Sequence, residues 1–104
     1  MVLKLLDKKY YRDHVYLVFE IKNRSGIDFK IDYLNINRVT TSKKQRASFQ
    51  RLKEKVIYKY DFPEVILKNQ SYKFIYVLPK FVLGENEKLE VELLELNGSR
   101  KILL

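Results

Sequence analysis

Residues 14–37 read HVYLVFEIKNRSGIDFKIDYLNIN, and this stretch decides the fold class of the chain. Successive side chains of a strand point to opposite faces, so a period of two is typical of a half-buried antiparallel strand. The stretch predicts two long strands, at about 14–22 and 27–38, joined by a tight turn at the central Asn-Arg-Ser-Gly. Apolar side chains take every second position on both sides of that turn: Val15, Leu17, Phe19, Ile21, then Ile27, Phe29, Ile31 and Tyr33.

The second of these strands changes phase near its middle. After Tyr33 the apolar positions move to Leu34 and Ile36, which lie on the alternate face. A slip of one residue inside a strand is what a β-bulge produces, and bulges also bend strands. We therefore predict a β-bulge at Tyr33-Leu34.

Turn residues divide the remainder of the chain into further short strands. Pro63 and Pro79 end the strands before them, because proline cannot donate a ladder hydrogen bond. Asn97-Gly98 is typical of a two-residue type I′ hairpin turn, which needs positive φ at both positions. We expect these further strands at 2–6, 55–60, 65–67, 71–78, 89–96 and 100–104.

Three other segments differ in how clearly they are patterned. Residues 71–78 carry apolar side chains on both phases, which predicts a central strand covered on both faces. Residues 7–13 are predicted to be a polar connection. Residues 40–53 lack a clean period; we predict a turn at 40–44 and then an irregular or extended edge segment, with a short helix at 43–52 as the alternative.

Length and composition agree with a single folded domain. The 104 residues, 46% of them hydrophobic, are enough for one hydrophobic core. About seven to eight short strands separated by turns predict an all-β fold, an antiparallel β-sandwich of the immunoglobulin-like kind over residues 1–104. The sequence has no cysteine, which excludes disulfides and thiolate metal sites. No apolar run reaches the roughly 20 residues that a membrane-spanning helix needs.

Charge is unevenly distributed along the chain, whose formal net charge is +8. Residues 38–55 contain seven basic residues and one acidic residue, Glu54. Residues 85–95 contain five acidic residues and one basic residue, Lys88. Such segregation predicts electrostatic docking to a partner, which can include a second copy of the same subunit.

No pattern of catalytic or metal-binding residues occurs. The single histidine, His14, has no evident partner and is interpreted as structural. On one strand Asp28 and Asp32 would lie about 13 Å apart, too far for a glycosidase pair. Glu90 and Glu92 would lie about 6.6 Å apart, with no base beside them. The sequence therefore predicts no enzyme, no metal and no cofactor.

Three Asn-x-Ser triplets, which begin at Asn23, Asn69 and Asn97, are potential glycosylation acceptors. All three fall at predicted turns, where asparagine and serine are favoured for backbone reasons. We interpret them as turn residues.

The basic segment 38–55 is the main functional candidate of the sequence. Three interpretations stay open: a solvated edge that prevents edge-to-edge aggregation, a protein-docking surface, or a nucleic-acid surface that uses Phe49, Tyr58 and Tyr60. The last is less favoured because Val56, Tyr58 and Tyr60 alternate as core residues do. The candidate partner-docking residues are Arg38, Lys43, Lys44, Arg46, Arg51 and Lys53.

Five segments in unchanged order carry a resemblance to a known family. They are Tyr16–Ser25, Ile27–Asp32, Lys43–Ser48, Leu78–Phe81 and Glu95–Arg100. Over residues 8–104 the chain resembles the C-terminal domain of the TraN proteins of Bacteroidetes-type conjugative transposons. The family offers no catalytic residue to transfer to this sequence.

The resemblance implies a periplasmic, outer-membrane-associated structural subunit of a conjugative type IV secretion apparatus. The implied partners are other subunits of that apparatus, including a lipoprotein and a scaffold subunit, with self-association in a ring. No small-molecule substrate is implied, and a nucleic-acid-binding β domain that uses residues 38–55 is the alternative. The chain has no signal peptide, so the resemblance also implies the C-terminal domain of a longer exported protein.

Overall fold

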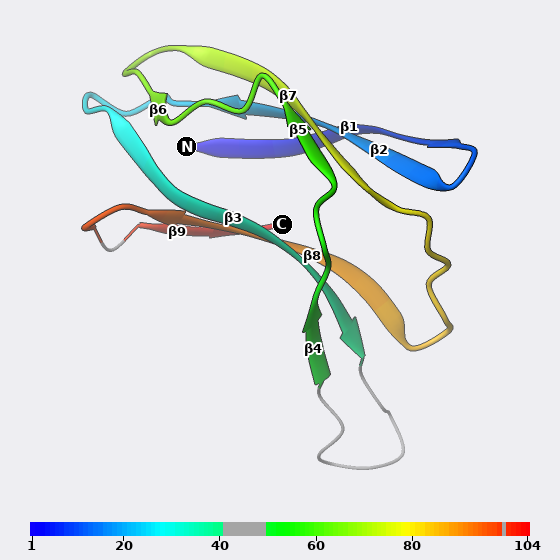
Figure 1. Cartoon of the computed structure of the whole chain (residues 1–104). Helices are drawn as coiled ribbons and strands as arrows, with labels where there is room; N and C mark the ends of the chain where they lie inside the picture. Colours follow the sequence, from blue (N-terminus) through cyan, green and yellow to red (C-terminus); the bar gives the residue numbers. More distant parts are fainter. Residues whose placement is uncertain (41–49, 99) are drawn as a thin grey trace.

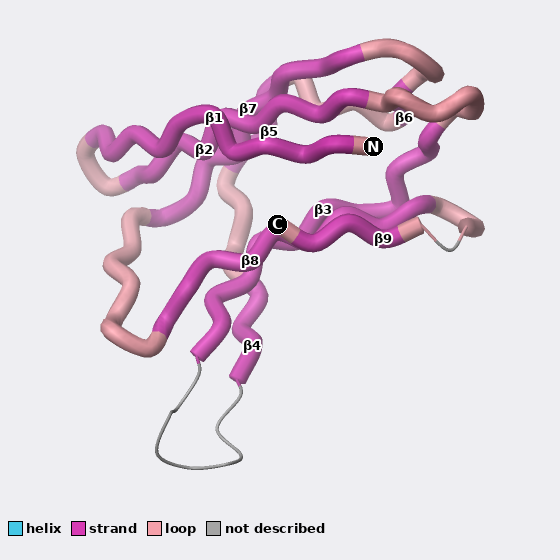
Figure 2. The backbone as a smooth tube through the Cα atoms, turned by 180° about the vertical axis from the view of Figure 1, so that it is seen from behind, coloured by secondary structure: helices cyan, strands magenta, loops and turns pink. Residues whose placement is uncertain are grey.

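Nine antiparallel strands in two sheets form the part of the chain that the computed structural model describes, residues 1–40, 50–98 and 100–104 (Figure 1). The sheets face each other, as the view from behind also shows (Figure 2). These residues contain no helix that is long and apolar enough to cross a membrane. The strands are β1 (Val2–Tyr11), β2 (His14–Lys22), β3 (Phe29–Thr40), β4 (Gln50–Lys53), β5 (Tyr58–Tyr60), β6 (Val65–Ile66), β7 (Ser71–Pro79), β8 (Glu87–Glu95) and β9 (Lys101–Leu103).

The strand order confirms the predicted immunoglobulin-like sandwich. One sheet has the order β1-β2-β7-β5 and the other has the order β4-β3-β8-β9, with β6 also paired to β3. These orders correspond to the A-B-E-D sheet and to the C-F-G sheet of an immunoglobulin domain, with β4 added beside the C strand. The count of nine exceeds the expected seven to eight because residues 50–53, predicted to be part of an irregular or extended edge segment, form a strand of their own, β4.

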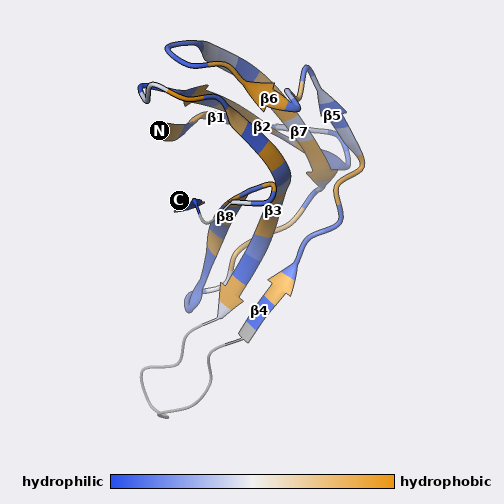
Figure 3. Ribbon diagram, turned by 90° about the vertical axis from the view of Figure 1, so that its left-hand side faces the viewer, coloured by the Kyte–Doolittle hydropathy of each residue, from blue (hydrophilic) through white to orange (hydrophobic). Residues whose placement is uncertain are grey.

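The hydrophobic core lies between the two sheets. Strand β2 alternates as predicted: Val15, Leu17, Phe19 and Ile21 are fully buried and the residues between them are half-buried. Figure 3 shows hydrophobic and hydrophilic residues following one another in bands along β3. The main buried side chains are Val15, Leu17, Phe19 and Ile21 from β2, Phe74, Tyr76 and Leu78 from β7, Leu34 and Ile36 from β3, and Val91 and Leu93 from β8.

Four aromatic rings meet at the centre of the first sheet's inner face. Phe74 stacks on Phe19 with 5.3 Å between the ring centroids. Phe62 approaches Phe74 edge to face at 5.2 Å and Tyr76 at 5.3 Å. Edge-to-face and offset stacked rings stabilise a core beyond the area that they bury.

The Tyr76 hydroxyl should be dispensable for stability. The residue is fully buried and its oxygen has no hydrogen-bond partner among the described residues. Burial also raises the pKa of this hydroxyl. Because an unpaired buried hydroxyl is destabilising, Tyr76→Phe is expected to raise the free energy of unfolding by about 1 kcal/mol. Urea denaturation measures this change, with the exposed Tyr60→Phe as a neutral control; a loss of stability would show that the hydroxyl has a partner.

The turn between β2 and β3 is not a hairpin turn. Strands β2 and β3 belong to different sheets, so residues 23–28 carry the chain across the sandwich. Strand β3 consequently begins at Phe29, two residues later than predicted, and Ile27 is 62% exposed. The alternation of Ile27 with Phe29 therefore does not reflect a strand at Ile27, which belongs to the turn.

Asn23 organises this crossing. Its Nδ2 donates to the carbonyl oxygens of Ile27 (2.9 Å) and Ile66 (3.0 Å). Its Oδ1 accepts hydrogen bonds from the backbone N–H and the hydroxyl of Ser25, at 3.0 and 2.7 Å. Every polar atom of the buried side chain is therefore used, and the interpretation of Asn23 as a turn residue is confirmed.

Several predicted boundaries need correction. Strand β1 extends through the expected polar connection to Tyr11, and Arg12 turns with a φ of 54°. The segment 55–60 is a strand only from Tyr58, because residues 54–57 pass from one sheet to the other. The predicted bulge exists one step earlier, between Ile31 and Tyr33.

The final hairpin forms, but its turn is not of type I′. Strand β9 pairs back on β8, and Glu95 N–H donates to the Arg100 carbonyl. Asn97 has a φ of 53°, whereas Gly98 does not have a positive φ. A two-residue type I′ turn requires positive φ at both positions, so Asn97-Gly98 does not form one.

Candidate partner-docking site

The predicted docking residues divide into three groups in the structure. Lys43, Lys44 and Arg46 lie outside the described residues. Arg38 and Arg51 are occupied within the domain, as described below. Lys53, at the end of edge strand β4, faces an open cleft. The helix alternative at 43–52 is wrong for residues 50–52, which belong to β4, and its other residues lie outside the described part.

Arg38 ties β3 to the segment that follows β4. Its Nε lies 3.0 Å from Glu54 Oε1, and its guanidinium lies 5.4 Å from the centre of the Phe81 ring. The Nε–H does not hydrogen-bond to that carboxylate, so the contact is an ion pair. The half-buried Arg38 therefore has a structural role in the isolated domain.

Arg51 is held by the acidic part of the same chain. Its Nε and Nη2 contact the two carboxylate oxygens of Glu90 at 2.9 and 3.2 Å. Asn37 Nδ2 also donates to Glu90, at 3.2 Å. A bidentate arginine–carboxylate pair is among the stronger surface contacts. A partner carboxylate would compete with Glu90 for this guanidinium, whose side chain is 42% exposed.

Two further glutamates of the acidic segment are paired in the same way. Glu92 lies 2.9 Å from Lys101 Nζ, and this hydrogen bond is the main cause that lowers the pKa of the carboxyl. Arg100 donates from Nε to Glu95 at 2.8 Å and likewise lowers the pKa of Glu95. Three glutamates of the acidic segment are thus paired within the domain, one of them with Arg51 of the basic segment.

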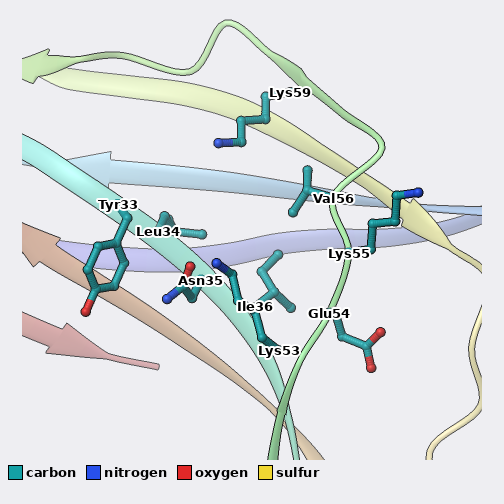
Figure 4. A pocket seen from close by; sticks show the side chains of 9 residues that line it. All are labelled: Tyr33, Leu34, Asn35, Ile36, Lys53, Glu54, Lys55, Val56 and Lys59. Atoms are coloured by element: carbon teal, nitrogen blue, oxygen red, sulfur yellow. The ribbon is translucent and has the colours of Figure 1, made fainter.

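A cleft of about 450 Å³ lies where the chain passes from β4 to β5 (Figure 4). Three lysines, Lys53, Lys55 and Lys59, lie around it, and apolar side chains from β3 together with Val56 line its floor. Figure 4 shows Lys53 and Lys59 extending to one side of the crossing segment, above β3, while Lys55 and Glu54 point to the other side. The full lining is Tyr33, Leu34, Asn35, Ile36, Lys53, Glu54, Lys55, Val56 and Lys59.

The positive charge of this cleft is not neutralised by the domain itself. All acidic residues of the chain lie in the described part, and no carboxylate forms an ion pair with Lys53, Lys55 or Lys59 there. The one acidic lining residue, Glu54, is paired with Arg38. Lys59 Nζ instead lies 5.3 Å from the ring centres of Phe62 and Tyr76. The cleft is therefore suited to an anionic group from outside.

Lys59 is the site residue that sequence reasoning missed. It lies beyond the basic segment and between two tyrosines that looked like core residues. The structure reverses that prediction: Tyr58 and Tyr60 are 56% and 47% exposed, and the Nζ of Lys59, which is also exposed, lies over the Phe62 and Tyr76 rings. Strand β5 has only three residues, which is too short for a local pattern to show which of its side chains face the core.

A second groove lies at the opposite pair of sheet edges. It is apolar and of about 500 Å³, and it lies where edge strand β1 approaches β8 and the last residue. Its lining is Leu3, Lys4, Leu5, Leu6, Leu89, Val91 and Leu104. Within the described residues, no group of histidine and acidic side chains could hold a metal ion.

Fold and cleft together define a small immunoglobulin-like β-sandwich with an exposed basic cleft at one pair of sheet edges. The chain belongs to the family of the domain of unknown function DUF4138, whose model matches residues 2–104. No curated protein and no solved structure matches the chain.

Proposed function

We propose that this chain is a non-enzymatic structural subunit of a conjugative type IV secretion apparatus. Its sandwich serves as a protein–protein interaction module of the outer-membrane core complex, on the periplasmic side. It is the C-terminal domain of a longer exported protein of the TraN kind. Its partners are other subunits of the apparatus, including a lipoprotein and a scaffold subunit, and copies of itself in a ring.

The observation that carries the docking role is the basic cleft. Three lysines without a carboxylate partner line a cleft that also has apolar lining, and its one acidic lining residue, Glu54, is paired with Arg38. Charge that is left unpaired next to apolar surface is typical of a surface that a complementary partner covers. The resemblance of five ordered segments to TraN supports the particular apparatus.

The exposed tyrosines favour one second candidate, a nucleic-acid-binding β domain. The rings of Tyr58 and Tyr60 lie 4.4 Å apart on the solvent side of β5. Exposed aromatic rings near lysines can stack on bases of single strands. Affinity for single-stranded DNA would then fall steeply with salt, by about 0.7 log units per log unit of salt for each phosphate contacted.

A pull-down from the envelope of conjugating donor cells tests the proposal. The tagged protein that carries this chain is isolated and its companions are identified by mass spectrometry. We expect subunits of the transfer apparatus to copurify, and Lys53→Glu/Lys59→Glu to reduce their recovery at least about tenfold, since reversed charges repel an acidic partner. Lys68→Glu/Lys80→Glu, with the same change in net charge at exposed loop positions, is the matched control. Recovery of DNA, or of the protein alone from the soluble fraction, would contradict the proposal.

A further inference from the structure

The edge of β3 contains a gap at the cleft. Strand β4 pairs with residues 37–40 of β3, and β6 pairs with residues 29–30. Between them, Glu54 N–H donates to the Ile36 carbonyl (2.7 Å), and Ile31 N–H donates to the Glu64 carbonyl (2.9 Å). These two hydrogen bonds mark where the chain leaves this edge and where it returns.

Leu34 lies inside this gap. In an antiparallel ladder every second residue presents both its N–H and its C=O to the same edge. The carbonyl of Ile36 faces the outer edge, so the backbone of Leu34, two residues earlier, faces it too. No described strand pairs with Leu34 on that side. An unpaired backbone donor and acceptor at a sheet edge is a template for another extended chain.

The cleft around this gap adds two further kinds of contact. Half-buried Val56 gives it an accessible apolar floor beside the buried Leu34 and Ile36, and the Lys53 and Lys59 side chains extend over β3 at its rim (Figure 4). An extended peptide places successive side chains on opposite faces, so an apolar side chain can face the floor while its neighbours face outward to the lysines. The lysines carry positive charge and so select acidic neighbours.

We propose that the cleft binds an extended acidic segment of a partner polypeptide. The segment pairs with the backbone of Leu34, places one apolar side chain against the floor, and sets flanking carboxylates beside Lys53 and Lys59. This inference rests on the proposed protein-docking function and names the chemistry of the partner at the same site.

Two observations favour a peptide over a nucleic acid at this site. A sugar–phosphate backbone lacks the alternating N–H and C=O groups that would pair with Leu34. In addition, Lys59 alternates with Tyr58 and Tyr60 along β5, so the exposed rings lie on the opposite face from the Lys59 side chain. Stacked bases and the lysine cleft would therefore not share one surface.

An NMR titration of the purified chain tests the inference. The probe is the blocked peptide acetyl-Glu-Val-Glu-Val-Glu-amide, and its counterpart with lysine in place of glutamate is the control ligand. We expect the acidic peptide to shift the amide resonance of Leu34 and to bind more weakly as salt is raised. We expect Lys53→Glu/Lys59→Glu to reduce affinity at least about tenfold. The control pair Lys68→Glu/Lys80→Glu should bind as the unmodified chain does.

Each alternative result has a definite meaning. An unmoved Leu34 amide, or equal binding by both double variants, would overturn the inference, as would tighter binding of oligothymidylate through the same lysines. Lys53→Gln/Lys59→Gln, with its melting temperature measured, separates loss of charge from loss of folding; unchanged affinity in this variant would also overturn it. Copurification of apparatus subunits without peptide binding at Leu34 would reject the cleft as a peptide-binding site but would still support the proposed function.

Discussion

Replacement of Asn23 by alanine is expected to lower the free energy of unfolding by about 3 kcal/mol. The side chain is 1% exposed and makes four hydrogen bonds that hold the crossing between the sheets. The alanine variant leaves the buried carbonyl of Ile66 without this donor, and an unsatisfied buried group is costly. Urea denaturation of the two proteins measures the difference.

Two companion variants make the Asn23 result specific. Asn23→Asp keeps the acceptor for Ser25 but removes both donors, so we expect it to be nearly as destabilising as alanine. Gln70→Ala, an exposed side chain beside the same crossing, should change stability by less than about 0.5 kcal/mol. Equal stability of the Asn23→Ala and Gln70→Ala variants would contradict the assigned role of Asn23.

Phe74→Ala is expected to produce the largest loss of stability, about 4 kcal/mol. Phe74 is 1% exposed and its ring contacts Phe19, Phe62 and Tyr76, with centroid distances of 5.2 to 5.8 Å. Removal of the ring leaves a cavity that neighbouring rings on two strands cannot readily fill. Because small domains have total stabilities of about 5–15 kcal/mol, the variant should be close to unfolding at physiological temperature.

A graded series tests this assignment without relying on an unfolded variant. Phe74→Leu keeps most of the buried volume and should lose about 1.5 kcal/mol. Thermal unfolding of the two variants and the unmodified chain should give midpoints in the order unmodified, leucine, alanine. Midpoints that are equal within error for all three would show that Phe74 is not at the centre of the core.

The strands that could be predicted from the sequence are those with one buried face and one more exposed face. Strand β2 has one face in the core and one toward solvent, so its pattern gave the bounds 14–22. Strand β1 could be predicted only for its first part, since from Lys4 to Tyr11 its side chains are exposed on both faces and carry no alternation. The pairing of β2 with β7, instead of with β3, depends on contacts between residues far apart in the sequence, from Lys22 with Ser71 to His14 with Pro79, which a local period does not encode.

The candidate site illustrates the same limit. Strand β3 lies between β4 and β8, so the side chains of Arg51 and Glu90 meet across it. No pattern in the sequence near either residue predicts this pair. The cleft arises because the chain leaves β3 at Glu54 and returns at Glu64. The sequence shows that residues 38–55 are basic. It does not show which of the lysines there lack a carboxylate partner, because that depends on how the strands pair.

Site-specific photo-crosslinking in conjugating donor cells tests the docking role of the cleft most directly. A photoreactive phenylalanine analogue replaces Lys55 at the exposed rim of the cleft or, as a control, Lys68 in the turn before β7. We predict that irradiation joins the Lys55 position, and not the Lys68 position, to a protein subunit of the transfer apparatus. Adducts with DNA at Lys55, or protein adducts at Lys68 with none at Lys55, would contradict the account.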